Sequence, residues 1–268
     1  MEPLSLVILL VMGTLAGAIN AAVGSGSLLT LPVLMAVGIP PGVAVRTNTV
    51  GMLFSTIGSV LGYRREIASE KRELPPLAIT AAVGSTAGAL LLLISPASAL
   101  DVVVPVLIVV ALAMVVFQKR LTAALRARAE RRSRAGQRAT PASDRSPLRS
   151  PALVGSIGAA SVYGGYFTAA QGILYLGILG TFTGRSMGSV NSVKNLLSLI
   201  VNLAAATVYV IAYFVVGAEI VWIASAAIAV GALVGGYFGA HLAKTMPEWL
   251  LRGVIVVVAL VALVRQVL

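Results

Sequence analysis

Cysteine is absent from the 268 residues, and histidine occurs once, at His241. The absence of cysteine excludes disulfide bonds and thiolate metal sites. A membrane enzyme would need paired carboxylates, a histidine cluster or a nucleophile with its base, and the sequence offers little material for any of them. A P-loop pattern for ATP is also missing. We therefore predict a protein that is not an enzyme and that uses no metal and no cofactor.

Charge is also scarce. Charged residues make up 11% of the chain, where a soluble domain has about 25%, and 58% of the residues are hydrophobic. Five long stretches contain no formally charged residue. They lie between Glu2 and Arg46, Glu73 and Asp101, Arg149 and Arg185, Lys194 and Glu219, and Glu219 and Lys244. Each can hold a spanning helix of roughly 20 residues, and none alternates as a barrel strand does. The sequence predicts an all-α polytopic protein of the inner cell membrane, whose first apolar run is a retained helix and not a signal peptide.

The net charge of +11 is concentrated in one segment. Ten of the twenty Lys and Arg residues lie between Lys119 and Arg149. This excess is typical of a cytoplasmic loop under the positive-inside rule, with attraction to anionic lipid headgroups as a secondary role. Nucleic acid is not a predicted partner, because the segment has no aromatic residues on which bases could stack.

The apolar runs fall into two halves of similar plan, residues 1–118 and 151–268, separated by a basic cytoplasmic linker at 119–150. We predict about four spanning helices in each half and a short broken or re-entrant element after the first of them. The spanning helices are expected at about 4–23, 44–63, 75–94, 100–117, 152–167, 187–215, 220–243 and 249–264. The short elements are 28–37, after Gly24-Ser25-Gly26-Ser27 and with Pro32 inside it, and 173–179, after Thr168-Ala169-Ala170-Gln171-Gly172.

The two halves also repeat each other in sequence. Asn48, Val50, Leu53, Ser55 and Ile57 match Asn191, Val193, Leu196, Ser198 and Ile200, and Gly84 and Gly88 match Gly231 and Gly235. Duplicated halves with an interruption at matching places indicate a secondary transporter with its site between them. If each short element crosses the membrane, each half has five crossings and the halves are inverted. If each dips and returns, each half has four and they are parallel; the charges at Arg185, Lys244 and Arg252 favour inversion slightly.

A polar stripe in the helix predicted at 187–215 is the most informative feature. Asn191, Lys194, Asn195, Ser198 and Asn202 share one helical face. This face would be costly in lipid, so it should face protein or a water-filled path. Two alternatives stay open: the Asn and Ser side chains are structural contacts between helices, or the Lys194 ammonium extends to the lipid headgroups.

The sequence resembles the TauE/SafE family of anion permeases, also called the sulfite-exporter or TSUP family, in both halves. The resemblance lies in Gly17–Leu34, Arg46-Thr47-Asn48, residues 163–174 and residues 191–205. It implies two related halves with an anion site between them. It also implies export of sulfite, a sulfonate or a related organic anion, coupled to protons. The serines of Gly24-Ser25-Gly26-Ser27 depart from the family's more glycine-rich run, and they either donate to the anion or change the substrate.

An oxyanion in a membrane needs donors and positive potential without being trapped. Broken helices offer free amides at their N-terminal ends, and Asn, Gln and Ser side chains are neutral donors. The candidate substrate-binding residues are Asn20, Gly24, Ser25, Gly26, Thr47, Asn48, Gln171, Gly172, Asn191, Lys194, Asn195 and Ser198. Asn20 is alternatively a cap of a broken helix, and the neighbouring Arg46 is either functional or an interfacial anchor.

The predicted partners are a small anionic substrate, a coupling proton and membrane lipids, with a second copy of the chain as a further candidate. Two other functions remain as alternatives. One is a permease for a metabolite without sulfur, and the other is a membrane scaffold or assembly protein that docks through the basic linker. A cation permease is disfavoured, because no acidic residue lies in the middle of a predicted helix.

Overall fold

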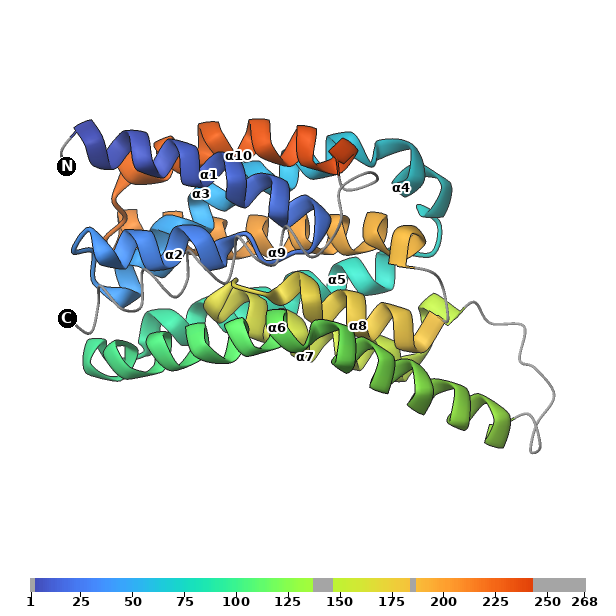
Figure 1. Cartoon of the computed structure of the whole chain (residues 1–268). Helices are drawn as coiled ribbons and strands as arrows, with labels where there is room; N and C mark the ends of the chain where they lie inside the picture. Colours follow the sequence, from blue (N-terminus) through green and yellow to red (C-terminus); the bar gives the residue numbers. More distant parts are fainter. Residues whose placement is uncertain (1–2, 137–146, 184–186, 243–268) are drawn as a thin grey trace.

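The computed structural model describes residues 3–136, 147–183 and 187–242, and within these ranges every regular element is a helix (Figure 1). The all-α prediction is therefore confirmed. The elements are α1 (Pro3–Ala22), α2 (Ser27–Ala36), α3 (Pro41–Gly62), α4 (Arg64–Glu70), α5 (Pro75–Ile94), α6 (Ala97–Gly136), the 3₁₀ turn η1 (Pro147–Arg149), α7 (Pro151–Phe167), α8 (Gln171–Thr183), α9 (Met187–Val216) and α10 (Trp222–Leu242).

Five helices have the length and apolar composition that crossing a membrane requires. They are α1, α5, the Ala97–Phe117 part of α6, the Val190–Val216 part of α9 and the Trp222–His241 part of α10. Their outer faces carry large exposed apolar side chains such as Ile79, Val83 and Phe214. Such faces are unfavourable in water and suit lipid hydrocarbon. The chain is therefore a multi-pass membrane protein.

The long helices form two groups, and each group contains a helix from the other half of the chain. In the first group, α10 packs along both α1 and α3. In the second group, α5 packs along both α7 and α9. Figure 1 shows α1, α3 and α10 in the upper part of the view and α6, α7 and α8 in the lower part. The groups meet where α3 packs on α9, so these two helices form the wall between them.

The first helices of the two halves, α1 and α7, run in opposite directions. The C-terminal end of α1 lies beside Tyr63, because Asn191 Nδ2 donates to both the Ala21 carbonyl oxygen (3.3 Å) and the Tyr63 hydroxyl (2.8 Å). The N-terminal end of α7 lies on the same side, since Arg149 Nη2 donates to the Arg72 carbonyl oxygen at 3.0 Å. Opposite directions agree with the inverted alternative. The division into two repeats with a linker stays a prediction.

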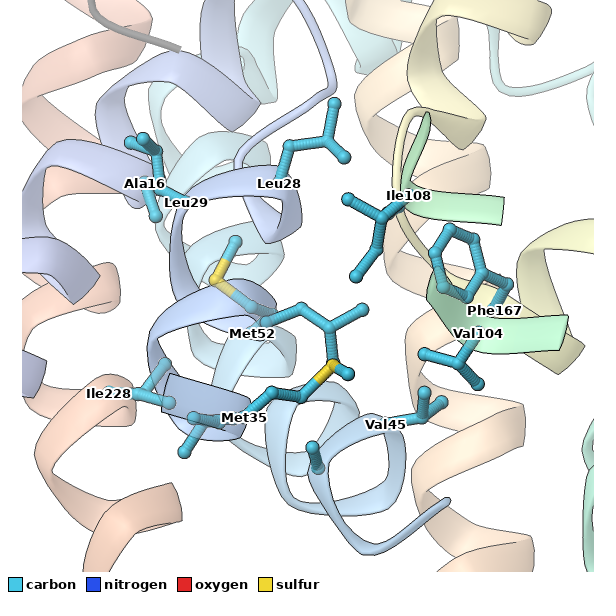
Figure 2. Close-up of a cluster of buried hydrophobic side chains, with 14 of the residues drawn as sticks. Ala16, Leu28, Leu29, Met35, Val45, Met52, Val104, Ile108, Phe167 and Ile228 are labelled. Atoms are coloured by element: carbon cyan, nitrogen blue, oxygen red, sulfur yellow. The ribbon is translucent and has the colours of Figure 1, made fainter. Parts of the chain in front are cut away.

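An apolar core surrounds the short helix α2. Figure 2 shows Leu28 and Met35 of α2 among side chains of the neighbouring helices, including Met52 of α3, Ile108 of α6 and Phe167 of α7. Eight of the ten residues of α2 are buried. A helix of this length is marginal alone, and packing against its neighbours is what stabilises it.

Several boundaries differ from the predicted ones. The helix expected to end at 117 continues to Gly136, so the predicted linker begins as helix. The reason is composition, since residues 121–135 are rich in Ala and Arg, which favour helix without any apolar face. A short helix, α4, replaces the loop expected after Tyr63, and α8 begins at Gln171 and not at Ile173. The helix predicted at 249–264 lies outside the described residues.

Glycines let α5 and α10, the helices that pack with the other half of the chain, approach their neighbours closely. A Cβ atom on Gly88 of α5 would overlap the Val162 carbonyl oxygen of α7, and one on Gly235 of α10 would overlap the Thr14 carbonyl oxygen of α1. The matched glycines of the two halves therefore serve packing, as expected for small residues between membrane helices.

We predict that Gly88→Val and Gly235→Val each lower the stability of the purified protein by about 1–3 kcal/mol, because overpacking forces the helices apart. Thermal unfolding in detergent measures this loss. Gly155→Ala is the control, since a Cβ there has no neighbour within 4 Å. Equal melting temperatures for wild type and both valine variants would contradict the packing account.

Candidate functional site

The first interruption separates α1 from α2. The helix ends at Ala22, the chain turns through Gly24 with φ of +84°, and α2 begins at Ser27. Positive φ is cheap only for glycine, which explains the residue at this place. A Cβ on Gly26 would overlap the Ala16 carbonyl oxygen, so the chain folds back directly against α1. The turn leaves the last carbonyl groups of α1 without partners within the helix.

The second interruption separates α7 from α8. It contains Thr168 at φ +67° and Ala170 at φ +59°, two residues with side chains in a region that glycine normally occupies. Such conformations are strained and are held only by their surroundings. Here the Tyr163 hydroxyl donates to the Ala169 carbonyl oxygen at 2.9 Å, and the Tyr209 hydroxyl donates to the Gly165 carbonyl oxygen at 2.7 Å. Two phenols thus close the broken end of α7.

The two interruptions meet. The Gly172 amide donates to the Gly24 carbonyl oxygen at 3.1 Å, and a Cβ on either glycine would overlap the backbone of the other. The hydroxyls of Thr49 and Thr168 lie 2.8 Å apart and add a link from α3 to the second interruption. Segments 148 positions apart in sequence are therefore joined backbone to backbone inside the protein.

The polar stripe of α9 lies on the broken end of α1. Lys194 Nζ donates to the carbonyl oxygens of Asn20 (2.9 Å) and Ala21 (3.1 Å). The side-chain amides of Asn191 and Asn195 also donate to Ala21, at 3.3 and 3.2 Å. The prediction that the stripe faces protein is confirmed. The alternative of Lys194 extending to the headgroups is wrong, since the side chain is 0% exposed and its ammonium binds carbonyl groups.

Six buried polar atoms around these segments lack a hydrogen-bond partner in the described part of the chain. They are Ser25 Oγ, Asn48 Nδ2, Gln171 Oε1, Asn191 Oδ1, Asn195 Oδ1 and Asn202 Oδ1. A buried polar group without a partner costs about 1–3 kcal/mol, so each of these atoms calls for an explanation. All six side chains are at least 93% buried.

We call the contact between Gly24 and Gly172 the junction. The remaining candidate residues have the following partners. Asn48 accepts from the Thr30 hydroxyl of α2, and Asn20 Nδ2 donates to Ser55 Oγ of α3 at 3.2 Å, so both asparagines link helices of the first group. Ser198 is buried on the stripe, one turn from Asn195. Thr47 is not brought to the junction. Its hydroxyl accepts from the Val221 amide at 3.0 Å, where α10 begins.

Arg46 and His241 each lie within hydrogen-bonding distance of a backbone carbonyl oxygen. Arg46 Nε donates to the Glu219 carbonyl oxygen at 3.0 Å and so holds the connection between α9 and α10. This contact lies at the connection before α10, and the choice between a functional residue and an interfacial anchor stays a prediction. His241 is exposed at the end of α10, with its Nδ1 lying 3.0 Å from the Tyr237 carbonyl oxygen.

Sequence reasoning missed five residues of the site: Thr30, Thr49, Tyr63, Thr168 and Tyr209. Thr30 and Thr168 gave no signal, because a hydroxyl near a break is common in any loop. Tyr209 follows Asn202 by seven positions and therefore continues the stripe of α9, so the same periodicity could have found it.

An all-helical membrane protein in which two interrupted helices face each other has the architecture of a secondary transporter. Comparison with known proteins agrees. The sequence profile of the family described as "Sulfite exporter TauE/SafE" matches residues 9–265. The chain therefore belongs to the TauE/SafE family, and it is a membrane transporter.

The relatives are likewise named as transporters. The "Probable membrane transporter protein YfcA" of Escherichia coli K12 is 27% identical over 261 residues, which cover 97% of this chain and 88% of the relative. A "Probable membrane transporter protein" of Haemophilus influenzae is 24% identical over 264 residues, covering 98% and 94%. "Probable membrane transporter protein ORF9" of Sinorhizobium sp. is 34% identical over 104 residues, covering 39% and 40%. No solved structure gives a significant match.

The variant Tyr209→Phe tests whether the hydrogen bond from the Tyr209 hydroxyl to the Gly165 carbonyl oxygen stabilises the broken end of α7. We expect it to lower stability by about 1–3 kcal/mol, because the Gly165 carbonyl group stays buried and loses its donor. Thermal unfolding in detergent is the measurement. Tyr166→Phe is the matched control, since its hydroxyl makes only a long contact of 3.4 Å to Ser95. Losses of the same size in both variants would mean that the Gly165 contact has no special role.

Proposed function

We propose that the chain is a secondary transporter of a small oxyanion, such as sulfite, a sulfonate or a related organic anion. We place its binding site at the contact of the two interruptions, Gly24 with Gly172. The observation that carries the proposal is this contact, together with the partnerless buried atoms of Ser25, Asn48 and Gln171 on the segments that converge there. An incoming ligand would supply the missing hydrogen bonds.

The charge of the interior favours an anion. Lys194 is the only Lys, Arg, Asp or Glu among the residues that the structure describes as buried. No buried carboxylate therefore offsets its charge within that set. A cation would meet a positive interior, whereas an anion would be attracted to it.

The two short helices add to this potential. Both α2 and α8 begin at the junction, so their N-terminal amides and the positive ends of their dipoles point toward it. Glycines on both sides let a ligand approach the backbone closely. Ser25 and Asn48 provide neutral donors, which hold an anion less tightly than a second cation would. Moderate binding of this kind is what release on the far side requires.

Alternating access follows from the packing of the two groups. The α1–α3–α10 group and the α5–α7–α9 group meet along α3 and α9, and each group carries one of the two interruptions. Rocking of one group against the other would expose the junction first to one side and then to the other. We further propose that a proton gradient drives transport and that the direction of transport is export.

A transport assay tests this function. Purified protein in liposomes should move labelled sulfite or a sulfonate, and a proton gradient should increase the rate. Transport only of a metabolite without sulfur would support the alternative permease. The absence of transport for every anion in the panel, from protein that remains folded, would contradict the proposal.

The variant Ser25→Ala separates binding from folding. Its Oγ has no partner in the described protein, so its removal should leave the melting temperature unchanged or raise it. Loss of one hydrogen bond to an anion should reduce transport at low substrate concentration about tenfold or more. Labelled-anion uptake into proteoliposomes measures the second effect.

Ser85→Ala is the matched control for this substitution. Ser85 Oγ donates to the Val201 carbonyl oxygen at 2.7 Å, so unlike Ser25 Oγ it already has a partner within the protein. We expect this variant to lose stability and to keep its transport rate per folded molecule. Unchanged transport in Ser25→Ala would remove this serine from the site.

A further inference from the structure

The ammonium of Lys194 occupies an unusual place. It lies at the C-terminal end of α1, bound to the carbonyl oxygens of Asn20 and Ala21 at 2.9 and 3.1 Å, and the whole side chain is 0% exposed. No salt bridge to Lys194 is seen among residues 3–136, 147–183 and 187–242, and its two acceptors are backbone carbonyl groups from another helix. This helix end carries the negative pole of the α1 dipole, where a cation is stabilising.

Two asparagine side chains bind the same end of α1. The Ala21 carbonyl group can only accept, so Asn191 and Asn195 must both turn their NH₂ groups toward it. Their Oδ1 atoms are thereby fixed in the opposite orientation, and neither has a partner in the described protein. The oxygens that hold the ammonium are therefore the two backbone carbonyls of a broken helix end, the kind of group that coordinates monovalent cations in transporters with unwound helices.

The second interruption provides an internal comparison. The end of α7 also has carbonyl groups beyond helical hydrogen bonding, and there the donors are the neutral hydroxyls of Tyr163 and Tyr209. Neutral donors are therefore enough to satisfy carbonyl groups in this protein. A lysine at the end of α1 offers a positive charge in addition to hydrogen bonds, which the phenols at α7 do not.

We propose that the C-terminal end of α1 is a monovalent-cation site that the protein fills with its own tethered ammonium, Lys194. Broken helix ends of this kind bind a coupling cation in other transporter architectures. Here the cation is covalently attached, so this site takes up neither Na⁺ nor K⁺. Removal of the side chain beyond Cβ should leave a site for a free alkylammonium ion. This inference concerns α1 and holds whether or not the transported substrate is an oxyanion.

The test uses Lys194→Ala with n-propylammonium, which matches the atoms that the substitution removes. Thermal unfolding of the full-length protein in detergent is recorded at constant ionic strength with n-propylammonium, ammonium or tetramethylammonium chloride. At about five times its dissociation constant, n-propylammonium should raise the melting temperature of Lys194→Ala by about 2–4 °C. Ammonium should act more weakly, and tetramethylammonium, which has no N–H donor, should have no effect.

Wild type and Lys194→Met are the controls, because in both the position is already filled. Neither should respond to n-propylammonium. Stabilisation of all three proteins to the same extent, or of none of them, would overturn the proposal.

If Lys194→Ala cannot be purified, Lys194→Met decides the question. It keeps the length of the side chain without its charge, so it should melt below wild type, while Lys71→Met, at an exposed position after α4, should not. A Lys194→Met protein as stable as wild type would overturn the proposal.

Discussion

Two helices are interrupted at buried positions, and the backbone groups released at both breaks must be satisfied by the protein, because a buried polar group without a partner is costly. The direct hydrogen bond from the Gly172 amide to the Gly24 carbonyl oxygen satisfies one backbone group of each break with a group of the other. Glycine is needed on both sides for the two backbones to touch. The stripe of α9 then satisfies the end of α1, and two tyrosines satisfy the end of α7. Several of the buried polar side chains therefore hydrogen-bond to backbone carbonyl groups at these breaks.

The breaks are alike in geometry and different in charge. The end of α1 is held by an ammonium and two amides, and the end of α7 by phenols. The beginnings of α2 and α8 contribute two further positive dipole ends at the same junction. A positive interior without a buried carboxylate in the described residues supports our proposal that the transported substrate is an anion. The helices α5 and α10 each pack within the group formed mainly by the other half, and the junction lies between these two groups, whose rocking we propose.

Sequence alone predicted the class of protein, both interruptions and the buried face of α9, because hydropathy and helical periodicity depend on local order. It did not predict which element the face would contact. Thr47, Asn48 and Thr49 illustrate the reason. They are consecutive, yet a helix turns about 100° per residue, and they contact the start of α10, α2 and the second interruption respectively. Adjacent positions in a motif thus have separate partners, which only the packed structure reveals.

The central claim is that the substrate binds where the two broken helices touch. A structure of the protein with bound selenite or selenate, located by the anomalous scattering of selenium, tests it most directly. We expect the selenium atom beside the Gly24–Gly172 contact, within hydrogen-bonding reach of Ser25 and Asn48. Selenium bound elsewhere, with this contact unchanged and no ion near it, would contradict the account.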